Sequence, residues 1–218
     1  MNVALLIFTD GRKECLQRTA ASAEARLVGT IQSRIVVNDS GDRRYAAWLD
    51  AAFPRYERIH HAERRGFCGA VQSGWASVPS DTDYVVHLED DFLFNEPVEL
   101  ANVIAVLEAH PHLAQMALRR QALGREVAFG GFVEQFSESY TETSWNGFHW
   151  FEHQRFFTTN PCVYPRRILE LGWPGPPECE GHFGFRLWPA GYKCAFWGKK
   201  SDAPKVHHIG KHRVGTGY

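Results

Sequence analysis

Three adjacent carboxylic acids, Glu89, Asp90 and Asp91, follow an expected core strand at residues 84–88. Neighbouring carboxylates repel one another and lose hydration when partly buried, so the cluster requires a compensating cation or fixed hydrogen-bond donors. In an extended strand, Glu89 and Asp91 would point to one face and Asp90 to the other. Two acids on one face suit Mg2+ or Mn2+, which bind oxygen ligands and leave positions for phosphate. The alternative interpretation is a solvated turn or a helix start, where acids are also common.

Polar residues also end two other expected strands. Thr9 and Asp10 follow an apolar run at residues 3–8, and Asp39 follows a second run at residues 34–37. Helical patterns separate these strands, which predicts βαβ units and a mainly parallel sheet. Such sheets bind ligands beyond the carboxyl ends of their strands. We therefore expect the polar groups to meet at one edge of the sheet.

The remaining pattern supplies the rest of the scaffold. Further elements are expected as helices at residues 12–27, 46–52, 70–78 and 97–109, and as strands at residues 56–61 and 113–118. A glycine-rich and aromatic stretch at residues 124–157 is interpreted as a long functional loop. Aromatic faces stack on sugars and bases, so Trp145, Trp150 and Trp173 are candidates for an acceptor platform. The alternative, core packing, is expected for at least one of them.

Composition and charge limit the possible classes of protein. With 218 residues, 44% of them hydrophobic, the chain can bury a substantial core. A formal net charge of −1 gives no general attraction to nucleic acid or membranes, although residues 199–213 form a basic patch. Five cysteines without C-x-x-C spacing argue against a disulfide framework or a structural zinc site, and favour a reducing, cytoplasmic location. The first apolar run is too short for a signal peptide or a membrane span.

Three motifs in the first half occur in a recognisable order. Residues 35–42, I-V-V-N-D-S-G-D, are similar to a strand ending in D-D-G-S, and residues 89–91 stand where a D-x-D motif is expected. Residues 66–74, G-F-C-G-A-V-Q-S-G, resemble an N-x-G-x-x-x-A-x-N-x-G segment, in which Gln72 and Ser73 replace the usual Asn. This ordered set resembles the GT-A fold glycosyltransferases, within them the family 2 type that uses nucleotide-diphosphate sugars.

The second half extends this resemblance. Residues 160–172 are similar to the strand and helix that follow the acceptor loop, and residues 178–193 to the segment that carries the catalytic acid. Residues 206–210, V-H-H-I-G, resemble the H-x-G element that completes the metal site. The resemblance implies an α/β, GT-A (Rossmann-like) fold with a mixed, mainly parallel sheet flanked by helices.

The same resemblance implies a single domain over residues 1–218. Its nucleotide-sugar-binding lobe would span residues 1–95, and its acceptor and catalytic lobe residues 96–218.

Metal-binding and catalytic roles follow from the resemblance. Asp91 is expected to be the principal ligand of Mn2+ or Mg2+, Glu89 a direct or water-mediated helper, and His208 the third ligand. The structural alternative for His208 is a packed or solvated histidine. Glu180 is the expected catalytic base, with Glu178 as its substitute because the P-P-E-C-E spacing allows either. An acidic residue at a helix start is the structural alternative for Glu180.

Donor binding is assigned to the strand ends and to the basic C-terminal segment. The expected residues are Thr9, Asp10, Asp39, Arg65, Gly66, Asp90, Lys211 and Arg213. Asp39 would contact the nucleotide base, whereas Lys211 and Arg213 would touch the diphosphate or be solvated. A UDP-sugar is the expected donor.

The implied function is metal-dependent transfer of a sugar from a nucleotide-diphosphate donor to an acceptor hydroxyl, with inversion. A nucleotidyltransferase is one alternative. Such an enzyme normally has a glycine-rich basic loop after the first strand, and residues 8–12, F-T-D-G-R, contain only one glycine and one basic residue. A non-catalytic nucleotide-sugar-binding module is another. The acceptor stays open among glycan, protein, small molecule and modified DNA base, and the basic patch makes DNA a minority hypothesis.

Overall fold

The computed structural model describes residues 1–122, 124–128, 130–175 and 179–210. The helices are α1 (Lys13–Arg26), α2 (Arg43–Ala52), α3 (Gly66–Ser77), α4 (Leu100–Ala109), α5 (Gly124–Ala128), α6 (Arg166–Leu169), α7 (Cys179–Leu187) and the 3-10 helix η1 (Ser137–Ser139). The strands are β1 (Val3–Thr9), β2 (Leu27–Val28), β3 (Ser33–Asn38), β4 (Glu57–His60), β5 (Tyr84–Glu89), β6 (Phe92–Phe94), β7 (Val98–Glu99), β8 (Leu113–Leu118), β9 (Thr141–Trp145), β10 (Phe148–His153), β11 (Cys162–Pro165), β12 (Lys193–Trp197) and β13 (Val206–His208).

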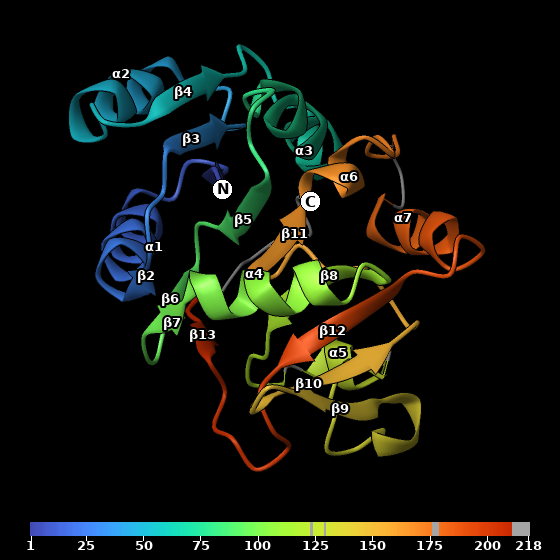
Figure 1. The fold of residues 1–218 in the computed structure, drawn as a ribbon. Coiled ribbons are helices and arrows are strands. Elements are labelled where there is room, and N and C mark those ends of the chain that lie inside the picture. The colour runs from blue at the N-terminus through green and yellow to red at the C-terminus, as the bar shows by residue number, and fades with distance from the viewer. Residues whose placement is uncertain (123, 129, 176–178, 211–218) are drawn as a thin grey trace.

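A nine-stranded sheet with helices on both faces organises the molecule (Figure 1). Its strand order is β4-β3-β1-β5-β11-β8-β12-β10-β9. Two short sheets, β13-β6 and β2-β7, complete the described strands. The mixed α/β sheet agrees with the predicted fold class.

The expectation of a mainly parallel sheet is only partly correct. Strands β4, β3, β1 and β5 run parallel to one another, and β8 is parallel to β12. In contrast, β11 is antiparallel to both β5 and β8, and β10 is antiparallel to both β12 and β9. The parallel βαβ pattern therefore describes the N-terminal half, while the C-terminal half is mixed.

A β-hairpin replaces much of the loop expected at residues 124–157. Strands β9 and β10 pair around Asn146 and Gly147, whose φ angles are 49° and 83°. Two successive positive φ angles characterise the type I′ hairpin turn, for which Asn-Gly is a preferred sequence. This dipeptide is the signal that the interpretation as a loop overlooked.

Two apolar clusters cover the two faces of the sheet. Leu5 and Ile7 of β1 belong to the cluster that includes side chains of α1, α2 and α4, whereas Leu6 and Phe8 belong to the cluster with α3 and α7. This alternation follows from the two-residue period of a strand. Because both faces are buried, β1 is a continuous apolar run rather than an alternating one.

The described cysteines differ in their bonding state. Cys68 is disulfide-bonded, contrary to the expectation from cysteine spacing, whereas Cys15, Cys162 and Cys194 are free thiols. Spacing along the chain does not report which sulfur atoms the fold brings together.

Among the described residues, no helix combines the length and apolar character that crossing a membrane requires.

His153 predicts a measurable acid sensitivity of the fold. Its side chain is buried, stacks on Phe196, and has a pKa lowered to about 3 by burial and the charge of Arg155. Histidine in the unfolded chain binds a proton near pH 6.5, whereas buried His153 does so only near pH 3. The unfolding free energy is therefore unaffected by this proton above pH 6.5 and decreases as the pH falls from 6.5 toward 3. Between pH 7 and pH 5, wild type should lose about 2 kcal/mol more unfolding free energy than His153→Phe. Urea unfolding of both proteins at each pH measures this difference, and equal pH dependence would contradict it.

Candidate active site

The carboxyl ends of β1, β3 and β5 lie side by side. Thr9 pairs with Asn38 and Phe8 pairs with Glu89 in the parallel register. The Thr9 hydroxyl donates to Asp90 Oδ2 at 2.6 Å and lies 2.7 Å from the Tyr45 hydroxyl. The polar strand ends therefore meet at one edge, as the alternation of strands and helices predicted.

The three adjacent acids point toward different partners. Strand β5 ends at Glu89, and Asp90 and Asp91 lie in the turn before β6. The strict alternation expected of a strand therefore stops at Glu89. Glu89 Oε1 lies 3.0 Å from the Thr159 hydroxyl, whereas Asp91 contacts His208 of β13. The turn spreads the three carboxylates over one polar region rather than over two sheet faces.

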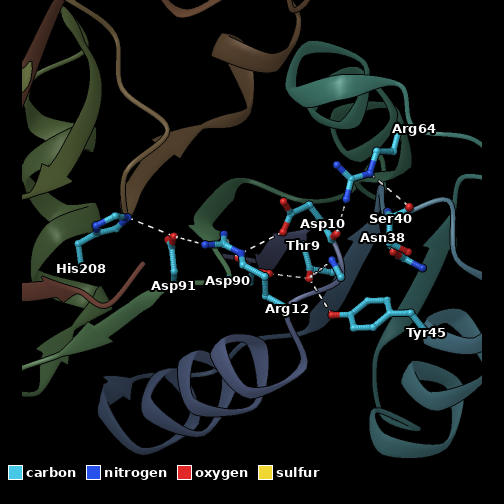
Figure 2. Close-up of polar contacts among 11 residues, drawn as sticks. Thr9, Asp10, Arg12, Asn38, Ser40, Tyr45, Arg64, Asp90, Asp91 and His208 are labelled. Carbon is cyan, nitrogen blue, oxygen red and sulfur yellow. Dashed lines mark hydrogen bonds and ion pairs between the residues drawn. The ribbon is translucent and has the colours of Figure 1, made fainter. Parts of the chain in front are cut away.

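Arg12 binds the acids at this edge, and the sequence analysis did not assign it to the site. Its Nε donates to Asp10 Oδ1 at 2.9 Å, its Nη1 to Asp91 Oδ2 at 2.6 Å, and its Nη2 to Asp90 Oδ1 (Figure 2). Burial disfavours the charged guanidinium, but Asp90 and Asp91 outweigh that effect and raise the pKa of Arg12 above its usual value. A basic residue directly after a polar strand end was the available signal.

The buried acids have different electrostatic environments. Burial raises the pKa of Asp90 to about 7, although Arg12 and the Thr9 hydroxyl act in the opposite direction. Burial also acts on Asp91, but its hydrogen bond with His208 and the charge of Arg12 hold the pKa of Asp91 below its usual value. Asp91 is therefore an ionised carboxylate at neutral pH, as a metal ligand must be.

Asp91 and His208 fit a divalent cation. His208 Nε2 lies 3.1 Å from Asp91 Oδ2, while Asp91 Oδ1 is buried without a hydrogen-bond partner among the described residues. The chain after His208 passes close to the acid: the Ile209 amide donates to the Asp91 carbonyl at 2.8 Å, and a Cβ on Gly210 would lie 2.1 Å from Asp91 Oδ2. A carboxylate suits Mn2+, and a neutral imidazole is a common protein ligand of metal ions.

Glu89 lies with a second carboxylate instead of joining Asp91 and His208 in a three-residue cluster. Within the described ranges, no group of three possible ligands has metal-site geometry. The Thr159 hydroxyl lies 3.0 Å from Glu89 Oε1 and 2.7 Å from Glu180 Oε1, and the Thr159 amide donates to the same Glu180 oxygen at 2.7 Å. Burial, then Asp91 and Glu180, raise the pKa of Glu89 to about 8.

A cavity of about 770 Å³ joins these groups. Its walls include Glu89, Glu180 and His208, so the expected base and two expected metal ligands face the same space. Such a volume is in the range of small-molecule sites. Glu89, Glu180 and His208 therefore share one cleft, and Asp91 adjoins it through its contact with His208.

Phenylalanines, and not the expected tryptophans, line the cavity. Trp150 and Trp173 are buried in the core at 0% and 6% exposure. In contrast, Phe156 and Phe185 line the cavity, and Phe185 is 70% exposed. These two tryptophans therefore follow the alternative of core packing and do not form an acceptor platform, because their large apolar rings fill the core.

Asp39 is buried near the start of α3 and contacts polar groups. Its Oδ1 accepts hydrogen bonds from the Arg65 amide at 2.8 Å and lies 2.7 Å from His61 Nδ1. His61 Nε2 lies 2.9 Å from the hydroxyl of Ser73, one of the residues that replaces the expected Asn. Gly66 begins α3 with a φ of 70°, a conformation that glycine adopts without strain.

Three expected site residues, Glu178, Lys211 and Arg213, lie outside the described residues.

The sequence matches one known protein family over most of its length. The family model described as glycosyl transferase family 2 matches residues 6–187, which include both carboxylate groups of the cleft. The chain belongs to glycosyl transferase family 2. No protein of curated function is detectably similar to this family 2 domain in sequence.

Solved structures show the fold of this family 2 domain. It is similar to GalNAc-T7 in a crystal structure with UDP, GalNAc and Mn2+, with a TM-score of 0.65 and 12% identity, covering 96% of this chain and 44% of that one. It is also similar to the mannosyltransferase PcManGT from Pyrobaculum calidifontis in complex with GDP-Man and Mn2+. The TM-score is 0.63 and the identity 16%, and the match covers 97% of this chain and 57% of that one.

A third similar structure is S. aureus TarS 1-349, with a TM-score of 0.64 and 12% identity, covering 96% of this chain and 60% of that one. The family 2 domain thus spans about half the length of these chains. Together with the family match, these similarities confirm the predicted GT-A glycosyltransferase fold.

Proposed function

We propose that this family 2 domain transfers a sugar from a nucleotide-diphosphate donor to an acceptor hydroxyl, using a divalent cation and inverting the anomeric carbon. One observation carries the proposal: Glu89, Glu180 and His208 line one cavity, and His208 contacts the buried Asp91 at the strand edge. A site for a cation and a site for a proton acceptor are therefore adjacent, and sugar transfer needs both.

The relatives support the class of donor. GalNAc-T7 was solved with UDP and Mn2+, and PcManGT with GDP-Man and Mn2+. We propose a UDP-sugar as the donor and Asp39 as the residue that contacts its base. The other proposed donor-binding residues are Thr9, Asp10, Arg65, Gly66, Asp90, Lys211 and Arg213.

The proposed chemistry divides between two groups of side chains. Asp91 and His208 would hold the cation, with Glu89 as a water-mediated helper, or as a direct one once it has released its proton. A bound cation neutralises the charge that develops on the leaving diphosphate. Glu180 would accept the proton of the acceptor hydroxyl, and Thr159 positions Glu180 through its amide and hydroxyl. Attack opposite the leaving diphosphate inverts the anomeric carbon.

The family match favours sugar transfer over nucleotidyl transfer, while the acceptor remains a separate proposal. Glycan, protein, small-molecule and modified-base acceptors all offer a hydroxyl, and DNA is retained as the minority hypothesis. A cytoplasmic location is also retained as a proposal, although disulfides such as that of Cys68 are rare in reducing compartments.

A thermal-shift panel tests the donor site. UDP, GDP, dTDP and CMP sugars are each added with and without Mn2+. One nucleotide sugar is expected to stabilise the domain by about 2.7 kcal/mol at 100 times its dissociation constant, and to require Mn2+ for this effect. That stabilisation corresponds to a rise in Tm of about 5–10 °C for a chain of this size. If no nucleotide sugar shifts the Tm under any condition, the proposed function is wrong.

A further inference from the structure

Arg12 occupies the acidic edge of the site with three carboxylate contacts. The guanidinium binds Asp10, Asp90 and Asp91, and the Arg12 side chain remains 24% exposed. Gly11 precedes it with a φ of 111°, which turns the loop back toward the acids. An arginine is charged at every physiological pH, so this contact persists wherever the acids are ionised.

The same Asp91 oxygen is shared by two positively polarised groups. Asp91 Oδ2 accepts from Arg12 Nη1 at 2.6 Å and lies 3.1 Å from His208 Nε2. A cation held by Asp91 and His208 would therefore lie within a few ångströms of a permanent positive charge. Like charges at that separation repel strongly in a partly buried site. Arg12 and a divalent cation consequently compete for Asp91.

We propose that Arg12 is a counter-cation tethered to the chain. Before ligands bind, it neutralises the acids at the strand edge and thereby weakens the binding of metal alone. When donor and metal bind together, Arg12 transfers its contact to the diphosphate. This inference rests on the proposed function. A guanidinium group can bind two oxygens of a phosphate through two parallel N–H donors, as it binds the two oxygens of a carboxylate. The diphosphate therefore offers the displaced Arg12 an equivalent partner. The role assigned to Arg12 is that of a positioning residue that couples the two ligands.

The coupling has a thermodynamic signature. If metal alone must displace Arg12 from Asp91, a nucleoside diphosphate that accepts Arg12 tightens metal binding, and metal tightens nucleotide binding by the same factor. Direct chelation between metal and diphosphate also couples the ligands and does not need Arg12. The contribution of Arg12 is therefore the part of the coupling that disappears when its charge is removed.

The test measures Mn2+ binding without turnover. Electron paramagnetic resonance of free Mn2+ gives the dissociation constant for wild type and Arg12→Met, each with and without UDP. Arg12→Met is expected to bind Mn2+ alone about tenfold more tightly, because a repelling charge has been removed. UDP should tighten Mn2+ binding in both proteins, but by a smaller factor in Arg12→Met.

Two variants separate this role from a structural one. Arg12→Lys keeps the charge and should bind Mn2+ alone within about threefold of wild type, because the repulsion is retained. Arg64→Met is the matched control, since Arg64 donates to the backbone oxygens of Asp10 and Ser40. Removing that charge should leave the Mn2+ affinity close to wild type, because Arg64 does not compete for Asp91.

The outcomes distinguish the two proposals. If wild type binds Mn2+ but Arg12→Met binds it equally or more weakly, the inference about Arg12 is overturned and the proposed function stands. Wild type that binds no Mn2+ with or without UDP would overturn both. Should Arg12→Met fail to fold, Arg12→Gln takes its place, because it also removes the charge but keeps an amide that can donate to the acids, and the same comparison with wild type decides the inference.

Discussion

Replacing Asp91 by asparagine is expected to lower kcat/KM for sugar transfer by about 10³-fold or more, because a ligand of the proposed cation loses its charge and that cation contributes several kcal/mol at the leaving diphosphate. Asparagine keeps the size of the side chain and one oxygen that can accept from Arg12 or the His208 imidazole. The fold should therefore survive, and the loss should appear in the chemistry. Initial rates over a range of donor concentrations at saturating Mn2+ measure it, once the donor panel has identified the substrate.

A matched control supports the interpretation of Asp91. Glu57 is an exposed acid on the edge strand β4, so Glu57→Gln removes one negative charge without touching the cleft. Its rate should equal that of wild type. Asp91→Ala should resemble Asp91→Asn in activity and retain cooperative unfolding. Full activity of either Asp91 variant would show that the metal site has been assigned to the wrong residue.

Replacing Glu180 by glutamine is expected to lower kcat by about 10²–10⁴-fold, which is the usual contribution of a general base. Glu180 Oε1 accepts from the Thr159 amide and hydroxyl at 2.7 Å each. Glutamine retains an oxygen at that position and so preserves these hydrogen bonds, but its amide cannot accept the acceptor proton. Donor and Mn2+ dissociation constants should stay within about threefold of wild type, because they depend on other residues.

Variants of the neighbouring acids identify the base. Glu178→Gln should keep nearly full kcat if Glu180 is the base, and the reverse result would move the role to Glu178. Thr159→Val should give an intermediate loss of kcat with unchanged donor affinity, since it leaves Glu180 in place but removes one of its two hydrogen bonds from Thr159. A Glu180→Gln enzyme with unchanged kcat would exclude Glu180 from proton transfer.

The local pattern of the chain was sufficient to predict the scaffold of the N-terminal half. Strands β1 and β5, expected at residues 3–8 and 84–88, are each one residue longer, and the helices expected at residues 12–27 and 46–52 differ from α1 and α2 by a few residues. These elements depend on apolar periodicity and turn residues, which are local properties. Their alternation also sufficed to place Thr9, Asn38 and Glu89 at one edge, because parallel strands share their carboxyl ends.

The tertiary structure alone decided which groups contact one another at that edge. Glu89 faces Thr159, which is 70 residues away in the chain, and Asp91 meets His208 from a strand near the C-terminus. The disulfide of Cys68 and the burial of Trp150 likewise depend on long-range packing. The sequence by itself determined that acids end a core strand. Only the folded chain decided that Arg12 neutralises them, because a charge finds its partner through space and not through spacing along the chain.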